Sequence, residues 1–202
     1  MSWRSMKQNN LEEAILKYAH DVGKAKRLIR TGWKEKVGVK SPESVAEHMY
    51  RTAVIAMALS DLAGLNTERV LKMTLLDDLA ETVVGDLTPA QKKTQGFAKS
   101  KHQEERALKQ ILSSLPKLLR EEYTRIWIEA QSLKSKEAKL VKSSDKLEMA
   151  IQAQEYSRQE YDARKLVEFI ESAGRKIHDP QTRKIFNLLK RETKLISSTV
   201  CE

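Results

Sequence analysis

An acidic segment at residues 75–89, LLDDLAETVVGDLTP, holds most of the side chains that could do chemistry. Asp77, Asp78 and Glu81 fall within five positions of a predicted helix, and Asp86 follows in a Gly-Asp turn. Asp78 shares a predicted helix face with leucines at spacings of three and four. Because burying an unpaired carboxylate costs several kcal/mol, this face must supply a cation, a metal ion or a proton.

His48 and Asp145 are the candidates outside this segment. His48 occupies a slot in an apolar stripe, where a histidine is more often a core residue than a metal ligand. Asp145 is expected at the edge of another stripe, half-buried, and the simplest interpretation pairs it with Lys142 or Lys146. Side chains from three stripes can nevertheless converge inside a helical bundle. Imidazole plus carboxylates is a ligand set for Mn, Fe, Co or Zn.

The elements that position these residues are predicted to be helices almost throughout. Ser41 is expected to cap a helix that runs to about residue 63, with Pro42 in its first turn. Asn66 is expected to cap the helix that carries the acidic residues without a break to about residue 85. Thr88 and Pro89 repeat the start signal before a loop or short helix. The remaining predicted helices cover residues 11–29, 100–114, 117–132, 135–159, 162–174 and 180–195.

Composition favours one all-α domain over residues 1–202, with a core at 11–160 and the helices of 162–195 packed on it. The net charge of +9 attracts phosphates, but Lys and Arg are spread over nearly every helix. Since no groove-reading motif appears, nucleic acid is not an expected partner. The single cysteine, Cys201, suits a reducing cytoplasm. No apolar run reaches membrane-spanning length, so we expect a cytoplasmic protein without membrane contact.

Four motifs carry a family resemblance: RTGW at 30–33, SVAEHMYR around His48, the acidic segment, and DKLEMA from Asp145. Together they resemble the HD-domain metal-dependent phosphohydrolases, in the branch of 5′-deoxynucleotidases that includes YfbR-type enzymes and the HD domain-containing protein 2 group. The resemblance covers about residues 11–160. It implies an HD-domain helical bundle of about seven or eight helices. It also implies a homodimer that hydrolyses nucleoside 5′-monophosphates, in particular deoxynucleotides, to nucleoside and phosphate.

The resemblance implies one divalent ion, Mn, Co or Zn with Mg as a further candidate, held by His48, Asp78, Asp145 and the residue at position 77. The family has histidine where this chain has Asp77. A carboxylate there would favour hard ions and make a bound water a weaker acid, so activity could be reduced or absent. We expect Asp77 to face the ion, one helical turn before Glu81.

The remaining roles that the resemblance implies concern catalysis and substrate binding. Glu81 and Asp86 would assist catalysis, while Arg30 and Trp33 would contact the nucleotide. Without the resemblance, Arg30 and Trp33 would be a surface charge and a packed tryptophan. Two alternatives stay open: an HD phosphohydrolase acting on triphosphates or cyclic nucleotides, and a non-catalytic HD protein that binds a nucleotide or a protein partner.

Overall fold

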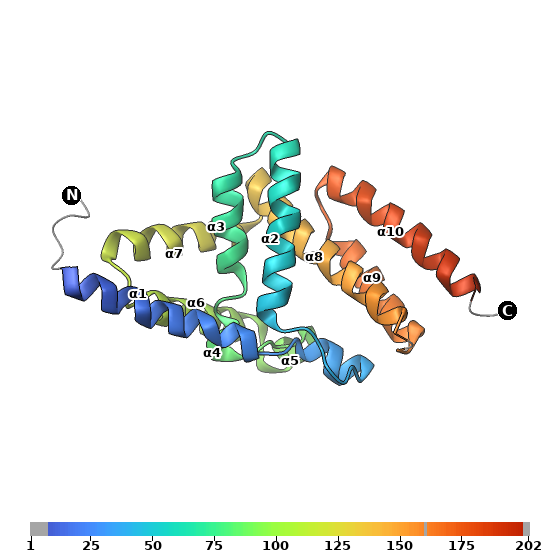
Figure 1. Cartoon of the computed structure of the whole chain (residues 1–202), viewed down its shortest axis with the longest axis horizontal. Coiled ribbons are helices and arrows are strands. Elements are labelled where there is room, and N and C mark those ends of the chain that lie inside the picture. Colours follow the sequence, from blue (N-terminus) through green and yellow to red (C-terminus); the bar gives the residue numbers. More distant parts are fainter. Residues whose placement is uncertain (1–7, 160, 200–202) are drawn as a thin grey trace.

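The computed structural model describes residues 8–159 and 161–199 and is built from helices (Figure 1). In that part of the chain there is no strand, only an isolated antiparallel bridge between Ile29 and Ser44. The all-α prediction is therefore confirmed, with ten α-helices within residues 8–159 and 161–199 instead of the seven or eight expected. Cys201 and the first seven residues lie outside the described residues. The elements are α1 Gln8–Gly23, η2 Lys24–Arg27, η3 Trp33–Val37, α2 Val45–Leu62, α3 Thr67–Asp77, α4 Glu81–Val84, α5 Pro89–Gln95, α6 Phe97–Leu112, α7 Lys117–Ser132, α8 Lys136–Ser157, α9 Ala163–Lys176 and α10 Pro180–Thr199.

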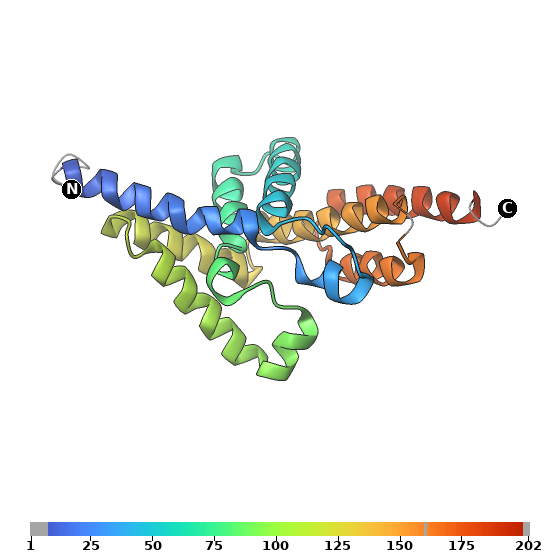
Figure 2. The ribbon, with the colours of Figure 1, turned by 60° about the horizontal axis from the view of Figure 1, so that its bottom comes forward.

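Helix α8 connects two apolar clusters and so holds the fold together. Its first half contributes Leu140 to a cluster shared with α2, α3, α6 and α7. Its second half contributes Leu147 to a cluster shared with η3, α9 and α10. Figures 1 and 2 show α9 and α10 on the opposite side of the molecule from α1, α6 and α7. Within the described residues, no helix combines the length and apolar character needed to cross a membrane.

The start of α2 lies three residues later than the sequence predicted. Ser44 caps this helix, and its side chain and that of Glu47 form a reciprocal capping box. That arrangement satisfies two backbone donors, whereas the predicted Ser41 cap would satisfy one. Residue 43 stays outside the helix, and its backbone N–H donates to the Tyr156 hydroxyl at 2.9 Å. The predicted cap and first-turn proline at Thr88 and Pro89 are confirmed as the start of α5.

The acidic helix is interrupted where the sequence predicted it to continue. Helix α3 ends at Asp77, and α4 begins at Glu81. Across this junction the backbone bonds span three residues, as in the bond from the Glu81 N–H to the Asp78 carbonyl at 3.0 Å. Because this tighter winding changes the direction of each side chain, the rule that residues four apart share a face does not apply to Asp77 and Glu81.

Candidate active site

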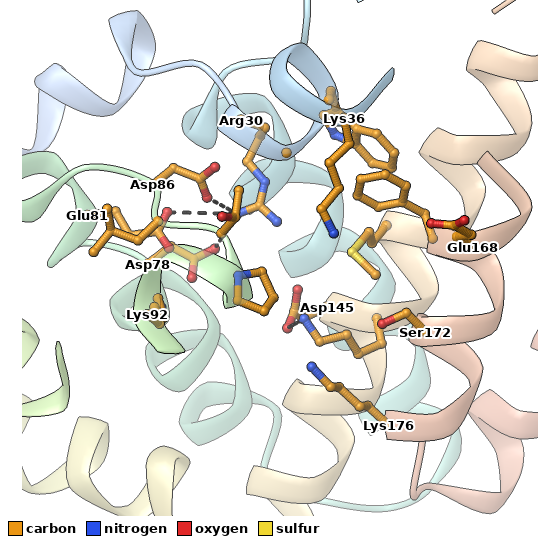
Figure 3. A pocket seen from close by; sticks show the side chains of 18 of the residues that line it. Arg30, Lys36, Asp78, Glu81, Asp86, Lys92, Asp145, Glu168, Ser172 and Lys176 are labelled. Carbon is orange, nitrogen blue, oxygen red and sulfur yellow. Dashed lines mark hydrogen bonds and ion pairs between the residues drawn. The ribbon is translucent and has the colours of Figure 1, made fainter. Parts of the chain in front are cut away.

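A cavity of about 320 Å³ lies where four distant parts of the chain meet (Figure 3). Its walls come from η3 and the residues before it, the segment from the end of α3 to the start of α6, the middle of α8, and one face of α9. Six of the eight predicted site residues line it, His48 reaches it through ion pairs with two of them, and Asp77 does not line it. The lining site residues are Arg30, Trp33, Asp78, Glu81, Asp86 and Asp145.

His48, Asp78 and Asp145 meet at the base of this cavity. His48 Nε2 lies 3.5 Å from Asp78 Oδ2 and 3.3 Å from Asp145 Oδ1. Asp145 is buried, not half-buried as expected, and His48 is only 1% exposed. One imidazole nitrogen therefore faces two carboxylate oxygens from two other elements. This donor chemistry suits a divalent transition metal, because imidazole and carboxylate are ligands that Mn, Co and Zn accept.

The other nitrogen of His48 is fixed from behind by Glu148, which is fully buried on α8. An ionised carboxylate can only accept, so the Nδ1–H of His48 donates to Glu148 and leaves Nε2 toward the cavity. Arg51 donates to the second oxygen of Glu148 through Nε at 2.9 Å and Nη2 at 2.8 Å. Burial and Arg30 lower the pKa of His48, but Asp145 and Glu148 outweigh both and raise it to about 10.

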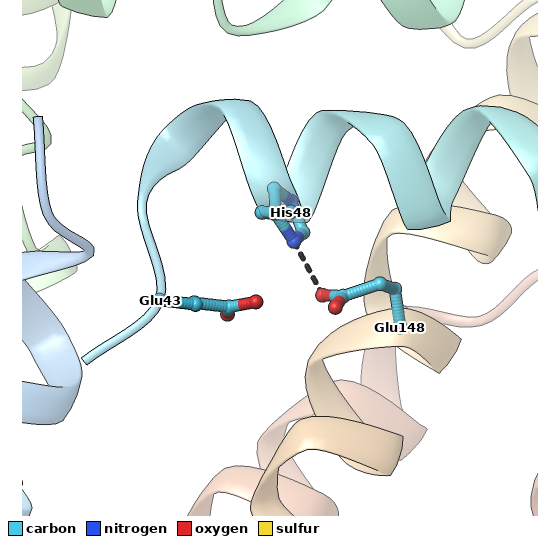
Figure 4. A group of neighbouring side chains, drawn as sticks. All are labelled: Glu43, His48 and Glu148. Carbon is cyan, nitrogen blue, oxygen red and sulfur yellow. Dashed lines mark hydrogen bonds and ion pairs between the residues drawn. The ribbon is translucent and has the colours of Figure 1, made fainter. Parts of the chain in front are cut away.

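Glu43, His48 and Glu148 also bring three ligand-type atoms within 4.8 Å of one another (Figure 4). These atoms already have partners, because Trp33 Nε1 donates to Glu43 at 2.9 Å and Glu148 binds both Arg51 and His48. Burial, followed by the nearby Glu148, raises the pKa of Glu43 to about 7. We therefore interpret this group as the support that orients His48 and not as the metal site itself.

Asp77 does not line the main cavity. Its Oδ1 accepts a hydrogen bond from Gln131 Nε2 at 2.6 Å, and its Oδ2 lies 3.6 Å from Lys142 Nζ. Asp77, Gln131 and Lys142 instead line a separate cavity of about 50 Å³ between α3, α7 and α8. The expectation that Asp77 faces the ion beside Glu81 therefore differs from the structure, because the chain turns out of α3 directly after Asp77.

Two lysines of α8 neutralise the acidic base of the cavity. Lys142 Nζ lies 3.1 Å from Asp145 Oδ2, and Lys146 Nζ lies 3.0 Å from the same oxygen. Lys142 therefore stands between Asp145 and Asp77. These two ion pairs agree with the pairing that the sequence suggested for Asp145, and they leave its Oδ1 directed to His48.

Arg30 is surrounded by three acids of the 75–89 segment. Its Nη1 donates to Asp86 Oδ1 at 3.0 Å and lies 3.9 Å from Asp78 and 3.8 Å from Glu81. The second oxygen of Asp86 accepts the backbone N–H of Thr31. Asp86 thus fastens the RTGW segment to the α4–α5 loop, and the charge of Arg30 is largely balanced within the protein.

Glu81 has an unsatisfied oxygen at the cavity. The residue is 8% exposed, and its Oε2 is buried without a hydrogen-bond partner. Burial raises the pKa of Glu81 well above its ordinary value, and Asp78 raises it further. Since buried polar atoms are nearly always hydrogen-bonded, this oxygen is placed to receive a water or ligand hydrogen.

Trp33 lies in the cavity wall but is only 2% exposed. Its ring packs against Phe169 with centroids 4.3 Å apart and against Tyr156 at 5.3 Å. The flat face that was expected to hold a sugar or base is thus in contact with α9. The indole N–H points away from the cavity, toward Glu43.

Sequence reasoning missed two kinds of site residue. Glu148 follows Asp145 by three positions, the same spacing as Asp78 and Glu81, and that spacing could have indicated a second inward-facing acid. By contrast, Lys36 of η3 and Lys176 of α9 line the cavity although nothing in their local sequence distinguishes them from other surface lysines.

Comparison with known proteins identifies relatives over most of the chain. A model of the HD domain family matches residues 22–185. The human protein named 5′-deoxynucleotidase HDDC2 is 39% identical over 180 residues, which cover 89% of this chain and 86% of that protein. The Schizosaccharomyces pombe protein named 5′-deoxynucleotidase hdd1 is 34% identical, with coverage of 89% and 90%. The crystal structure of the PH0347 protein from Pyrococcus horikoshii OT3 matches with a TM-score of 0.72 at 30% identity, covering 89% of this chain and 98% of that chain.

Proposed function

This chain belongs to the HD domain family, and from that premise we propose that it is a metal-dependent phosphohydrolase of nucleoside 5′-monophosphates. The names of the human and fission yeast relatives favour 5′-deoxynucleotides as substrates. The observation that carries the proposal is the convergence of His48 Nε2, Asp78 and Asp145 at the base of a cavity that also contains Glu81. Its products are the nucleoside and inorganic phosphate.

His48, Asp78 and Asp145 would hold one divalent ion. Bound there, the ion would neutralise phosphate charge and make a water a better nucleophile. Mn, Co and Zn suit this mixed nitrogen and oxygen set, and Mg suits it less. The structure gives Asp77 other partners, Gln131 and Lys142, so our proposed ligand set differs from the one that the sequence suggested.

Glu81 is the proposed general base. Its Oε2, which has no hydrogen-bond partner among the described residues, would accept a hydrogen from the attacking water, and its raised pKa would help it to take that proton near neutral pH. The water oxygen then bonds to phosphorus while the bond from phosphorus to the 5′ oxygen breaks, and the 5′ oxygen leaves with a proton from solvent. Asp86 would act by holding Arg30 and Thr31 in place. A direct nucleotide contact by Arg30 or Trp33 stays a prediction.

The proposed assembly is a homodimer in which the whole chain forms one functional domain. The proposal of one functional domain is supported by helix α9, which supplies part of the cavity wall.

The proposal of a homodimer is supported by an apolar surface on α1–α3, which is proposed to contact a second copy. Light scattering of the wild type and of a Tyr50→Glu variant would test this contact. A cytoplasmic location stays a prediction. The exposed members of this surface are Ile15, Tyr50, Val54, Met57 and Leu75.

A product assay tests the proposed function. Purified protein with Mn, Co or Zn would be given deoxynucleoside and ribonucleoside 5′-monophosphates, a deoxynucleoside triphosphate and a cyclic nucleotide. We expect inorganic phosphate from the monophosphates, with the deoxynucleotides preferred. Release of triphosphate, or cleavage of the cyclic nucleotide alone, would identify another HD phosphohydrolase. Nucleotide binding without any product would identify a non-catalytic protein.

A further inference from the structure

Most of the positive charge around the cavity is already neutralised by the protein itself. Arg30 faces three carboxylates, and Lys92 pairs with Glu104 at 2.7 Å. Lys142 and Lys146 pair with Asp145. An entering phosphate must compete with these carboxylates, so each of these four cations attracts it less than a free charge would. The cationic side chains that line the cavity are Arg30, Lys36, Lys92, Lys142, Lys146 and Lys176.

In the described part of the chain, Lys36 and Lys176 are not paired with a carboxylate in this way. Among the described residues, neither has a carboxylate oxygen within the 4.0 Å of an ion pair. Lys36 Nζ lies 5.5 Å from the centre of the Phe169 ring, within the range of a cation–π contact. Figure 3 shows the two side chains entering from opposite walls, each directed toward the part of the cavity that contains Asp145.

Lys176 has two other lysines of the cavity near it, and Asp145 offsets their charge only in part. Burial lowers the pKa of Lys176, and Lys146 and Lys142 lower it further. A dianion placed among these three ammonium groups would relieve their mutual repulsion. A phosphate monoester carries such a charge at neutral pH, whereas a nucleoside carries none.

We propose that Lys36 and Lys176 form an anion-binding pair that recognises the dianionic phosphate of the substrate from the two walls of the cavity. The inference rests on the proposed function and assigns phosphate recognition to residues outside the metal and acid–base groups. Because the two lysines come from η3 and α9, the pair also gives helix α9 a role in the site. A monoanionic phosphodiester would gain less from the pair than a phosphate monoester.

The test compares Lys36→Gln, Lys176→Gln and the double variant with the wild type, all loaded with Mn. Lys34→Gln and Lys165→Gln are matched controls, because these exposed lysines lie on the same two elements and do not line the cavity. Calorimetry would give the Kd of inorganic phosphate, and kinetics would give KM and kcat for 2′-deoxyadenosine 5′-monophosphate. Binding of uncharged 2′-deoxyadenosine serves as a check on the rest of the cavity.

We expect each single variant to bind phosphate roughly tenfold more weakly, as for the loss of one charge-assisted hydrogen bond. The double variant should lose more than either, with KM rising and kcat and nucleoside affinity little changed. Its phosphate affinity should also depend less on salt. Unchanged phosphate affinity in the double variant, or an equal loss in the controls, would overturn the pair. If the wild type binds phosphate through these lysines but releases no phosphate from nucleotides, that result would contradict the proposed function and leave the anion-binding pair intact.

Discussion

His48 and Glu148 form a buried pair in which the carboxylate binds Nδ1 of the imidazole and so turns Nε2 toward Asp78 and Asp145. Glu148 is fully buried and receives two further hydrogen bonds from Arg51. This pair fixes the orientation of the proposed metal ligand before any ion binds.

Glu148→Gln should therefore weaken metal binding by roughly 10-fold to 100-fold, the usual effect of losing a partner of a ligating histidine. The amide keeps the shape of the side chain but not its charge. Metal affinity measured by competition with a chelating dye would check this. Glu155→Gln is the control, because Glu155 also binds Arg51 but does not reach His48. Equal losses in the two variants would mean that Arg51, and not His48, is the important partner.

The two adjacent aspartates should behave differently when each is changed to asparagine. Asp78→Asn should reduce metal affinity by more than the roughly 100-fold that an outer partner contributes, since its oxygen faces His48. Asp77→Asn should leave metal content near that of the wild type and change stability by no more than about 1 kcal/mol, because the weaker contact with Lys142 is opposed by the burial that raises the pKa of this carboxyl. Metal analysis and urea unfolding give both quantities. Loss of metal in Asp77→Asn would return Asp77 to the ligand set.

The different positions of these neighbours show what the sequence could predict. Burial cost identified Asp78, because a charged residue in an apolar stripe requires a partner wherever the helix packs. The direction of Asp77 depends on the helix ending at that residue, and its contact with Lys142 depends on how α3 packs against α8. Lys176 joins the cavity only because α9 folds back along α8. Such long-range packing leaves no periodic signal in the local sequence.

Glu81→Gln should retain the fold and the metal but lose turnover by about 100-fold to 10,000-fold, as expected for a general base. Glutamine keeps the shape but cannot take a proton from water. The kcat for 2′-deoxyadenosine 5′-monophosphate, measured at equal metal occupancy, is the required quantity. Glu168→Gln is a control from the far wall of the cavity. If Glu81→Gln kept wild-type kcat, another group would have to activate the water.

The stability of the metal-free protein should fall as pH rises. The pKa of His48 is raised from its ordinary 6.5 to about 10, so the folded state holds this proton more tightly than the unfolded state. The resulting stabilisation is complete below pH 6.5 and is lost as pH approaches 10. The pKa of Glu43 is raised to about 7, so its contribution to stability is also lost as pH rises, at lower pH than that of His48. Urea unfolding at pH 6, 8 and 10 would measure the slope. His48→Gln should flatten it between pH 6.5 and 10, and an unchanged slope would contradict the assignment to His48.

The most direct test of the metal-dependent phosphohydrolase is a metal titration of protein stripped with a chelator. Phosphate release from a deoxynucleoside 5′-monophosphate would be followed as Mn or Co is added, with Asp78→Asn in parallel. The proposed site predicts no release from the stripped protein, a rate that rises in proportion to added metal and levels off at one ion per chain, and no recovery in Asp78→Asn. Full activity in the stripped protein, or equal recovery in Asp78→Asn, would contradict a metal centre built on His48, Asp78 and Asp145.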